Sequence, residues 1–159
     1  MNDTVAIDFA EYGRVFLPVY IKPYENTVME ATNFKVDTGA DFTTVSKKIL
    51  YSLGYDYDWI TQNALTGQQY NLSTAAGDME TVGIIQLPLI SLLGYEAAGW
   101  PFRILMEPKR DFRNLMGRDI LAGFDYTFRN SRQTFEISRI GRFSPLFPFL
   151  PGQSIHELV

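Results

Sequence analysis

The stretch Phe34-Lys35-Val36-Asp37-Thr38-Gly39-Ala40 places a carboxylate where a hydrophobic strand ends in a tight, glycine-containing turn. Residues 27–36 have the β-branched and aromatic composition that is typical of a strand. An acid at such a strand end is held rigidly and stays open to a cleft. The stretch therefore predicts a β-rich fold in which Asp37 is available for chemistry.

Short strand patterns continue on both sides of this stretch. Strands are predicted over residues 14–22, 27–36, 42–45, 70–74, 79–87, 89–93 and 100–106, and residues 125–129 and 133–139 indicate a hairpin. Short helices are predicted at residues 47–53, between the N-cap Ser46 and the stop signal Gly54, and at residues 118–124. We expect residues 55–69 to be irregular and residues 94–99 to form a connection. This pattern favours an all-β, closed or partly closed barrel or a sandwich over a doubly wound α/β fold.

The composition removes several catalytic chemistries. The chain has 159 residues, no Cys and one His, which is His156 in the C-terminal tail. Disulfide frameworks, thiol nucleophiles and zinc fingers are therefore excluded, and a Ser-His-Asp triad would depend on that tail residue. Carboxylates are abundant, with 18 Asp and Glu residues. We expect one domain with a proper core, carboxylate chemistry, and no metal or other cofactor.

Charge and hydropathy restrict the partners. The formal net charge is −4, and Asp111 interrupts the densest basic cluster, at residues 109–113. Nucleic acid is therefore not an expected partner, because phosphate binding needs a basic patch. The longest uncharged apolar run, residues 81–95, is shorter than the roughly 20 residues of a membrane helix. Residues 1–4 lack the features of a signal peptide. We expect no membrane association and a cytoplasmic location.

A second motif, Leu115-Met116-Gly117-Arg118, follows the first in the chain and opens the second predicted helix. Together with the run Val36-Asp37-Thr38-Gly39-Ala40-Asp41 and the later hairpin, it resembles the retropepsin-like aspartic proteases, especially their bacterial members. The resemblance covers roughly residues 14–139. It implies an all-β acid-protease barrel with one or two short helices and a flap hairpin.

The resemblance also implies a function. Asp37 would be the catalytic aspartate of an aspartic endopeptidase, a hydrolase of peptide bonds. Such enzymes need two carboxylates, and the chain has a single Asp-Thr-Gly triplet, so the implied active form is a homodimer with an Asp37–Asp37 dyad. The two acids share one proton and activate a water, and aspartic proteases are the standard example of this effect. The implied partners are a second copy of the chain and a peptide or protein substrate.

Supporting roles carry over from the resemblance to individual residues. Thr38 would hydrogen-bond across the two-fold axis, and Gly39 beside Ala40 would let the substrate backbone approach. Asp41 would pair with Arg118 and tie the turn to the helix. The flap closing over the peptide would be formed by Ala75, Ala76, Gly77 and Asp78. Apolar substrate pockets would be lined by Leu72, Ile84, Ile85 and Met116.

Other interpretations stay open on the residues alone. Asp37 is also a residue type that favours structural turns, Gly117 could serve only close packing, and Asp119 fits a solvated acid near a helix N-terminus. The chain could be a catalytically inactive module that dimerises and binds peptide, or a small-molecule-binding β-barrel. Beyond the domain of residues 1–140, the Pro/Phe-rich extension of residues 141–159 is expected to pack on the barrel or on the dimer partner.

Overall fold

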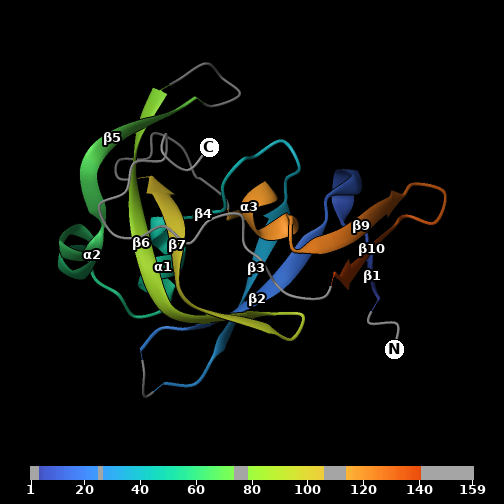
Figure 1. Cartoon of the computed structure of the whole chain (residues 1–159), viewed down its shortest axis with the longest axis horizontal. Helices are drawn as coiled ribbons and strands as arrows, with labels where there is room; N and C mark the ends of the chain where they lie inside the picture. Colours follow the sequence, from blue (N-terminus) through green and yellow to red (C-terminus); the bar gives the residue numbers. More distant parts are fainter. Residues whose placement is uncertain (1–3, 25–26, 74–78, 106–113, 141–159) are drawn as a thin grey trace.

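Strands dominate the computed structural model, which describes residues 4–24, 27–73, 79–105 and 114–140 (Figure 1). The strands are β1 (Val5–Asp8), β2 (Phe16–Lys22), β3 (Glu30–Val36), β4 (Thr44–Val45), β5 (Leu65–Ser73), β6 (Met79–Leu92), β7 (Tyr95–Leu105), β8 (Leu115–Met116), β9 (Phe124–Arg129) and β10 (Thr134–Arg139). The helices are the 3₁₀ turn η1 (Glu11–Gly13), α1 (Lys47–Ser52), α2 (Tyr57–Asn63) and α3 (Arg118–Leu121). The all-β class predicted from the sequence is confirmed. No helix in the described ranges is long and apolar enough to cross a membrane.

One sheet closes on itself and encloses the core. Its strand order is β2-β3-β8-β4-β7-β6-β5, and an additional pairing of β2 with β6 completes the closure. Residues alternate between the interior and the surface, so that Leu17, Val19 and Ile21 of β2 are fully buried while Tyr20 is exposed. The strands β3 and β8 run parallel as direct neighbours, which brings the two sequence motifs side by side.

The hairpin of β6 and β7 departs from the prediction. The sequence suggested a strand break at Pro88 and a connection at residues 94–99, but β6 continues through Pro88 and a turn at Leu93 and Gly94 leads directly into β7. These two turn residues have φ angles of 49° and 85°, the left-handed geometry that suits a tight hairpin. The strand tolerates Pro88 because the ladder makes no pair at that residue.

A third α-helix occupies part of the segment that was expected to be irregular, so the expectation of one or two helices was wrong. Asp56 caps α2, because its side chain accepts a hydrogen bond of 2.7 Å from the backbone N–H of Trp59. Tyr55 stacks on the Trp59 ring with centroids 3.9 Å apart and fixes the start of the helix. The other N-cap prediction, Ser46 for α1, is confirmed.

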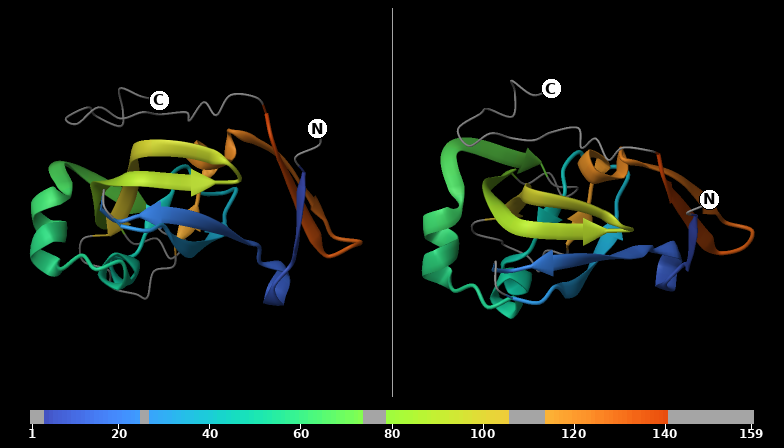
Figure 2. Two further views of the ribbon diagram at one scale, coloured as in Figure 1. Left: turned by 90° about the horizontal axis from the view of Figure 1, so that it is seen from below. Right: turned by 60° about the horizontal axis from the view of Figure 1, so that its bottom comes forward.

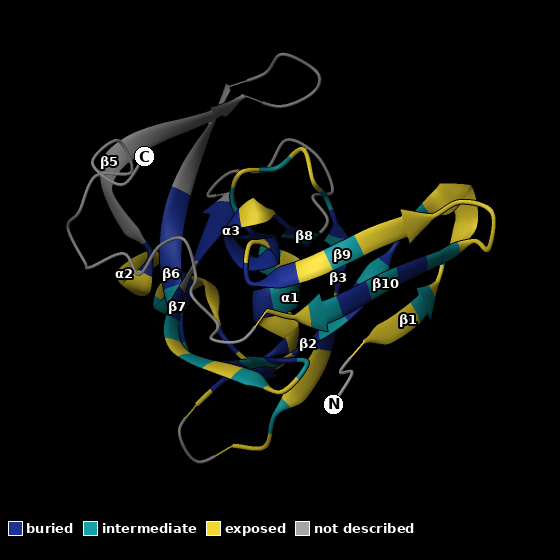
Figure 3. Ribbon diagram, turned by 45° about the vertical axis from the view of Figure 1, so that its right-hand side comes forward, coloured by how far each residue is buried: buried dark blue, intermediate teal, exposed yellow. Residues whose placement is uncertain are grey.

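A second sheet, with the order β1-β10-β9, lies at the end of the molecule away from α1 and α2 (Figure 2). Its β9–β10 hairpin confirms the prediction for the C-terminal part of the domain. Burial is uneven, because β10 contributes Phe135 and Ile137 to the core while much of β9 is exposed (Figure 3). Strand β1 was not predicted, since the strand with which it pairs among the described residues, β10, lies near the other end of the domain.

Candidate active site

Asp37 lies on a turn directly after β3, and backbone hydrogen bonds fix this turn. The Asp37 N–H donates to the Met116 carbonyl at 3.0 Å, and the Ala40 N–H donates to the Asp37 carbonyl at 3.1 Å. The Gly39 N–H donates to the Asp37 Oδ1 at 3.0 Å, which orients the carboxylate itself. Asp37 is partly exposed, and Thr38 and Gly39 are exposed. The turn therefore presents one oriented carboxylate at the protomer surface.

Helix α3 is attached to the same turn. The N–H groups of Arg118 and Asp119 donate to the carbonyls of Ala40 and Asp41 at 2.9 Å and 3.2 Å, which satisfies N–H groups that a helix start leaves free. Asp41 and Arg118 also form a salt bridge, the pairing expected from the resemblance. Both side chains are largely exposed, so this contact fixes geometry more than it adds stability.

Asp119 is a buried part of this framework, and the expectation of a solvated acid was wrong. Its side chain is almost inaccessible, with a residue exposure of 4%. Its Oδ2 accepts from the Thr43 N–H at 3.0 Å, and its Oδ1 accepts from the Thr43 hydroxyl at 2.7 Å and the Ile120 N–H at 2.9 Å. The Thr43 hydroxyl accepts in turn from the Gly117 N–H at 3.1 Å. Asp119 therefore joins the start of α3 to the chain that leaves the Asp37 turn.

The electrostatics of Asp119 reflect its position. Burial raises the pKa of its carboxyl above the ordinary value of 3.8, because the charged form loses its hydration. The hydrogen bonds from Thr43 and Ile120 lower the pKa of Asp119, and so does the positive charge of Arg103. The guanidinium of Arg103, itself buried, lies 4.1 Å from the centroid of the Phe42 ring.

Gly117 is needed because two backbone segments cross closely at this residue. A Cβ at position 117 would lie 2.6 Å from the carbonyl carbon, 2.7 Å from the oxygen and 2.8 Å from the nitrogen of Phe42. A backbone segment cannot move aside as a side chain can. The interpretation that Gly117 permits close packing is confirmed.

We expect Gly117→Ala to lower the free energy of unfolding by at least about 2 kcal/mol, because the backbone must shift to admit the methyl group. Gly39→Ala is the matched control, since its Cβ would meet only the Asp37 Oδ1, at 3.3 Å, on an exposed turn. The control should change stability by less than about 0.5 kcal/mol. Urea unfolding at one fixed protein concentration measures both, and equal losses would contradict the close-packing argument.

The residues predicted to line substrate pockets have different surroundings. Ile85 and Met116 belong to the hydrophobic core and are fully buried. Ile84 points to the other face of β6 and is 6% exposed. Leu72 lies in β5, but its side chain is outside the described residues. The predicted flap at residues 75–78 also lies outside them, between the paired strands β5 and β6.

Leu115 was not among the residues predicted from the sequence to line the site. Leu115 pairs with Lys35 in the β3–β8 ladder, and both are partly exposed, whereas the next pair, Met116 with Val36, faces the core. Leu115 therefore shares the outward face that leads to Asp37. The alternation of side chains along a strand was the signal that could have identified it.

The closed barrel, the hydrogen-bonded Asp-Thr-Gly turn and the attached Gly-Arg helix give this chain the fold of the retropepsin-like aspartic proteases. It is similar to the crystal structure of a retropepsin-like aspartic protease from Rickettsia conorii, with a TM-score of 0.58 and 20% sequence identity over 85% of this chain and 98% of that one. It also matches the protease of EIAV complexed with the inhibitor HBY-793, with a TM-score of 0.48 and 19% identity over 73% of this chain and 92% of that one. A third match is the retroviral protease-like domain of Ddi1 from Leishmania major, with a TM-score of 0.45 and 13% identity over 80% of this chain and 94% of that one. No protein-family model and no curated protein matches the sequence.

Proposed function

We propose that the chain is an aspartic endopeptidase whose active form is a homodimer with an Asp37–Asp37 dyad. The observation that carries the proposal is the Asp37 carboxylate, oriented by the Gly39 N–H and partly exposed at the surface of the protomer. One chain provides a single turn of this kind. A second copy, related by a two-fold axis, would supply the second carboxylate.

The neighbouring residues support this arrangement. Thr38 and Gly39 are exposed on the same turn, so a second copy can approach the carboxylate without displacing a core residue. In the dimer, Thr38 would hydrogen-bond across the axis and Gly39 would contact the substrate backbone. The hydrogen bonds from α3 to Ala40 and Asp41 would hold each turn rigid while the two carboxylates are brought together.

The chemistry follows from two carboxyl groups that share one proton. Two adjacent carboxylates repel each other, so one is protonated while the other is ionised. The ionised group takes a proton from a water between them, and the oxygen of that water attacks the carbonyl carbon of the peptide bond. The protonated group gives its proton to the carbonyl oxygen, which forms a tetrahedral diol. The C–N bond then breaks as the nitrogen takes up a proton and one diol hydroxyl returns a proton to the dyad.

An extended peptide would bind across both subunits as an added strand, with side chains entering alternate pockets. Leu115 is better placed for a pocket wall than Ile84, since it is partly exposed on the face that leads to Asp37 whereas Ile84 is 6% exposed. Residues 75–78 would form the flap.

Sedimentation and digestion of a peptide library test the proposal together. We expect a dimer at micromolar concentration and cleavage of extended apolar peptides when the library is digested over a range of about pH 4 to 7. Transition-state analogues that carry a hydroxyl in place of the attacked carbonyl should inhibit the cleavage. A monomer at every concentration would refute the shared dyad. A dimer without cleavage would instead favour the inactive peptide-binding module.

A further inference from the structure

An apolar recess lies between the first half of β7 and helix α3. Its lining consists of Val19, Ile90, Leu92, Tyr95, Ala97 and Ile120. Four of these side chains are 3% exposed or less and form the floor, whereas Tyr95 and Ala97 are partly exposed and form the rim. Because the lining is aliphatic and aromatic, the recess suits an apolar side chain.

The barrel wall explains why the core reaches the surface at this point. On one edge, β7 pairs with β6 along most of its length. On the other edge, within the described ranges, the ladder with β4 covers only Arg103 and Ile104 of β7. The pairing with β4 therefore does not extend to residues 96–99, beside which the recess lies.

The end of β10 lies next to the rim of the recess. Arg139, the last residue of β10, pairs with Phe124 in the β9–β10 ladder, and the Phe124 ring packs edge-on against the Tyr95 ring with centroids 5.5 Å apart. The guanidinium carbon of Arg139 lies 5.3 Å from the centroid of the Tyr95 ring. A Cβ on Gly94 would lie 3.1 Å from the Arg139 Nη1. The chain therefore leaves β10 beside Tyr95.

The residues that follow β10 supply an apolar side chain within reach. The sequence continues as Ile140-Gly141-Arg142-Phe143-Ser144-Pro145, so Phe143 is the first aromatic residue after the strand. The four steps from Arg139 to Phe143 span at most about 14 Å, and Arg139 itself already contacts Tyr95. A tether this short gives the ring a high effective concentration at the rim, since little chain entropy is lost on closure.

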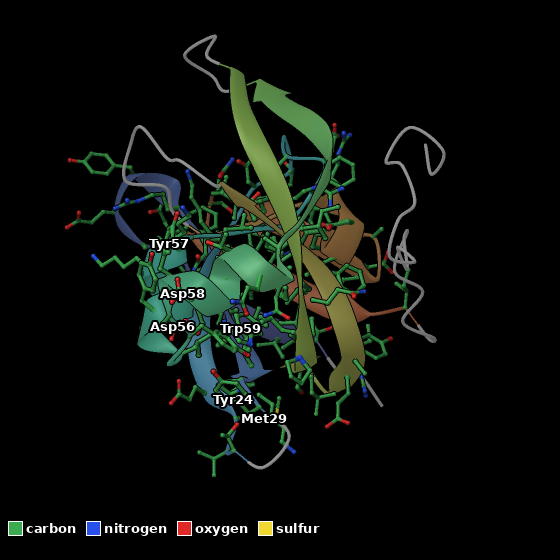
Figure 4. The ribbon with its side chains drawn as sticks, turned by 90° about the vertical axis from the view of Figure 1, so that its left-hand side faces the viewer. Tyr24, Met29, Asp56, Tyr57, Asp58 and Trp59 are labelled. Carbon is green, nitrogen blue, oxygen red and sulfur yellow. The ribbon has the colours of Figure 1, made fainter. Side chains whose placement is uncertain are left out.

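The face formed by α2 is the rival aromatic surface. Figure 4 shows Tyr24, Tyr57 and Trp59 on this face, from α2 and the connection after β2. Tyr57 is 61% exposed, so it also offers a ring to an apolar partner. However, α2 lies at the opposite end of the molecule from β10 (Figure 2). The recess is therefore the apolar surface that residues directly after β10 meet.

We propose that Phe143 docks over this recess in the same protomer, with its ring against Tyr95 and Ala97. The docking removes apolar surface from water on both the ring and the rim, which is the driving force. Ser144 precedes a proline and so favours an extended backbone, which leads the following chain away from the recess. Phe143 thus covers the end of the core between β7 and α3 and fastens the start of the C-terminal extension to the barrel.

Limited digestion with trypsin tests the docking, with mass spectrometry following the bond between Arg142 and Phe143. All proteins carry Asp37→Asn, so self-cleavage does not contribute and the result is independent of the proposed protease activity. We expect this bond to be cut at least about tenfold more slowly in the full-length chain than in a synthetic peptide of residues 137–149, equivalent to about 1.4 kcal/mol. Equal rates would overturn the docking.

Two substitutions in the extension identify the anchor. Phe143→Ser should remove the protection, judged against a peptide with the same change, because the ring that docks is lost. Phe149→Ser is the matched control, a second aromatic residue of the same extension, and should leave the protection intact. An equal loss of protection in both variants would overturn the assignment to Phe143. Neither variant changes a residue of the barrel, so this comparison does not depend on the folding of a mutated barrel.

Two adjacent alanines of β7 identify the recess. Ala97→Gln places a bulky polar group on the rim and should speed cleavage about tenfold. Ala98→Gln is the matched control, because Ala98 is exposed and its side chain points to the other face of the strand, and it should leave the rate unchanged. The bond after Lys48, inside α1, reports unfolding in the same digests and should be cut at the parent rate in both variants. Equal rates for the two alanine variants at the Arg142–Phe143 bond would overturn the recess as the docking surface.

Two further results separate the remaining possibilities. Tyr57→Ser should leave the protection unchanged, and faster cleavage in this variant would place the segment on the α2 face and overturn the proposal. Protection should also be independent of protein concentration, because the docking is within one protomer. Protection that disappears on dilution would place Phe143 on a second copy and overturn the assignment to the same protomer.

Discussion

Asp37→Asn is expected to lower kcat/KM for peptide hydrolysis by at least about 10³-fold, because an amide can neither take the proton of the water nor hold the shared proton. The fold should remain, since the amide oxygen can still accept the hydrogen bond that the Gly39 N–H now donates to Oδ1 at 3.0 Å. Initial rates on one cleaved library peptide measure the loss, and the urea unfolding midpoint checks the fold. Equal cleavage by both proteins would reject Asp37 as the catalyst.

Mixed dimers test whether the two carboxylates act together. Equal amounts of the parent and Asp37→Asn chains, allowed to exchange subunits, give parent homodimers as about a quarter of all dimers by random pairing. The mixture should therefore retain about a quarter of the activity of the same total amount of parent chain if both acids are needed. Independent subunits would leave about half. Mixing with Asp125→Asn, a change at an exposed aspartate of β9, is the control and should leave full activity.

Features that depend on residues close together in the chain were easier to predict from the sequence than contacts between distant segments. The Ser46 N-cap and the Gly54 stop of α1 were identified correctly, because a cap is made by residues within one helical turn. Asp56 carried the same kind of signal for α2, but the aromatic residues around it have no clear helical period, and the helix was missed. The pairing of Asp41 with Arg118 was expected only because two distant motifs resembled one family.

Interactions between distant segments could not be predicted from a local pattern. The Thr43 partner of Asp119 is 76 residues away, so the position of Asp119 in the first turn of α3 suggested solvent exposure. Met116 and Ile85 were predicted to line substrate pockets but lie in the core, because the side of the barrel wall that each faces follows from strand register. The register of a closed sheet depends on all of its strands, and a single sequence without the structure leaves it open.

Asp119→Ala is expected to destabilise the protein by about 4 kcal/mol, because it leaves the buried N–H groups of Thr43 and Ile120 and the Thr43 hydroxyl without their acceptor. Losing the carboxylate should also loosen the Asp37 turn, since the Gly117 N–H donates to that same Thr43 hydroxyl. Asp125→Ala provides the comparison, as an exposed acid whose loss should cost less than about 0.5 kcal/mol. Urea unfolding at one protein concentration compares the two variants with the parent chain.

Asp119→Asn separates the hydrogen bonds from the charge. Its amide oxygen can keep the two bonds made at Oδ1, while its NH₂ group faces the Thr43 N–H, so we expect a loss of about 1 kcal/mol relative to the protonated acid. Because burial raises the pKa of Asp119 above 3.8, the folded state binds this proton more readily than the unfolded state does. The protonated acid therefore contributes its full stabilisation when the pH is below the ordinary pKa of the carboxyl. This contribution decreases as the pH rises through the raised pKa of the folded state.

The difference in unfolding free energy between the parent chain and Asp119→Asn should accordingly be largest in acid and shrink as the pH increases. Unfolding of both proteins at a series of pH values measures this difference directly, and the other titrating groups cancel because they are common to both chains. A difference that grows with pH would mean that the hydrogen bonds to Thr43 and Ile120 outweigh the cost of burying the charge. In that case Asp119 would be ionised in the folded protein at lower pH than its burial implies, and it would contribute a fixed negative charge behind the Asp37 turn.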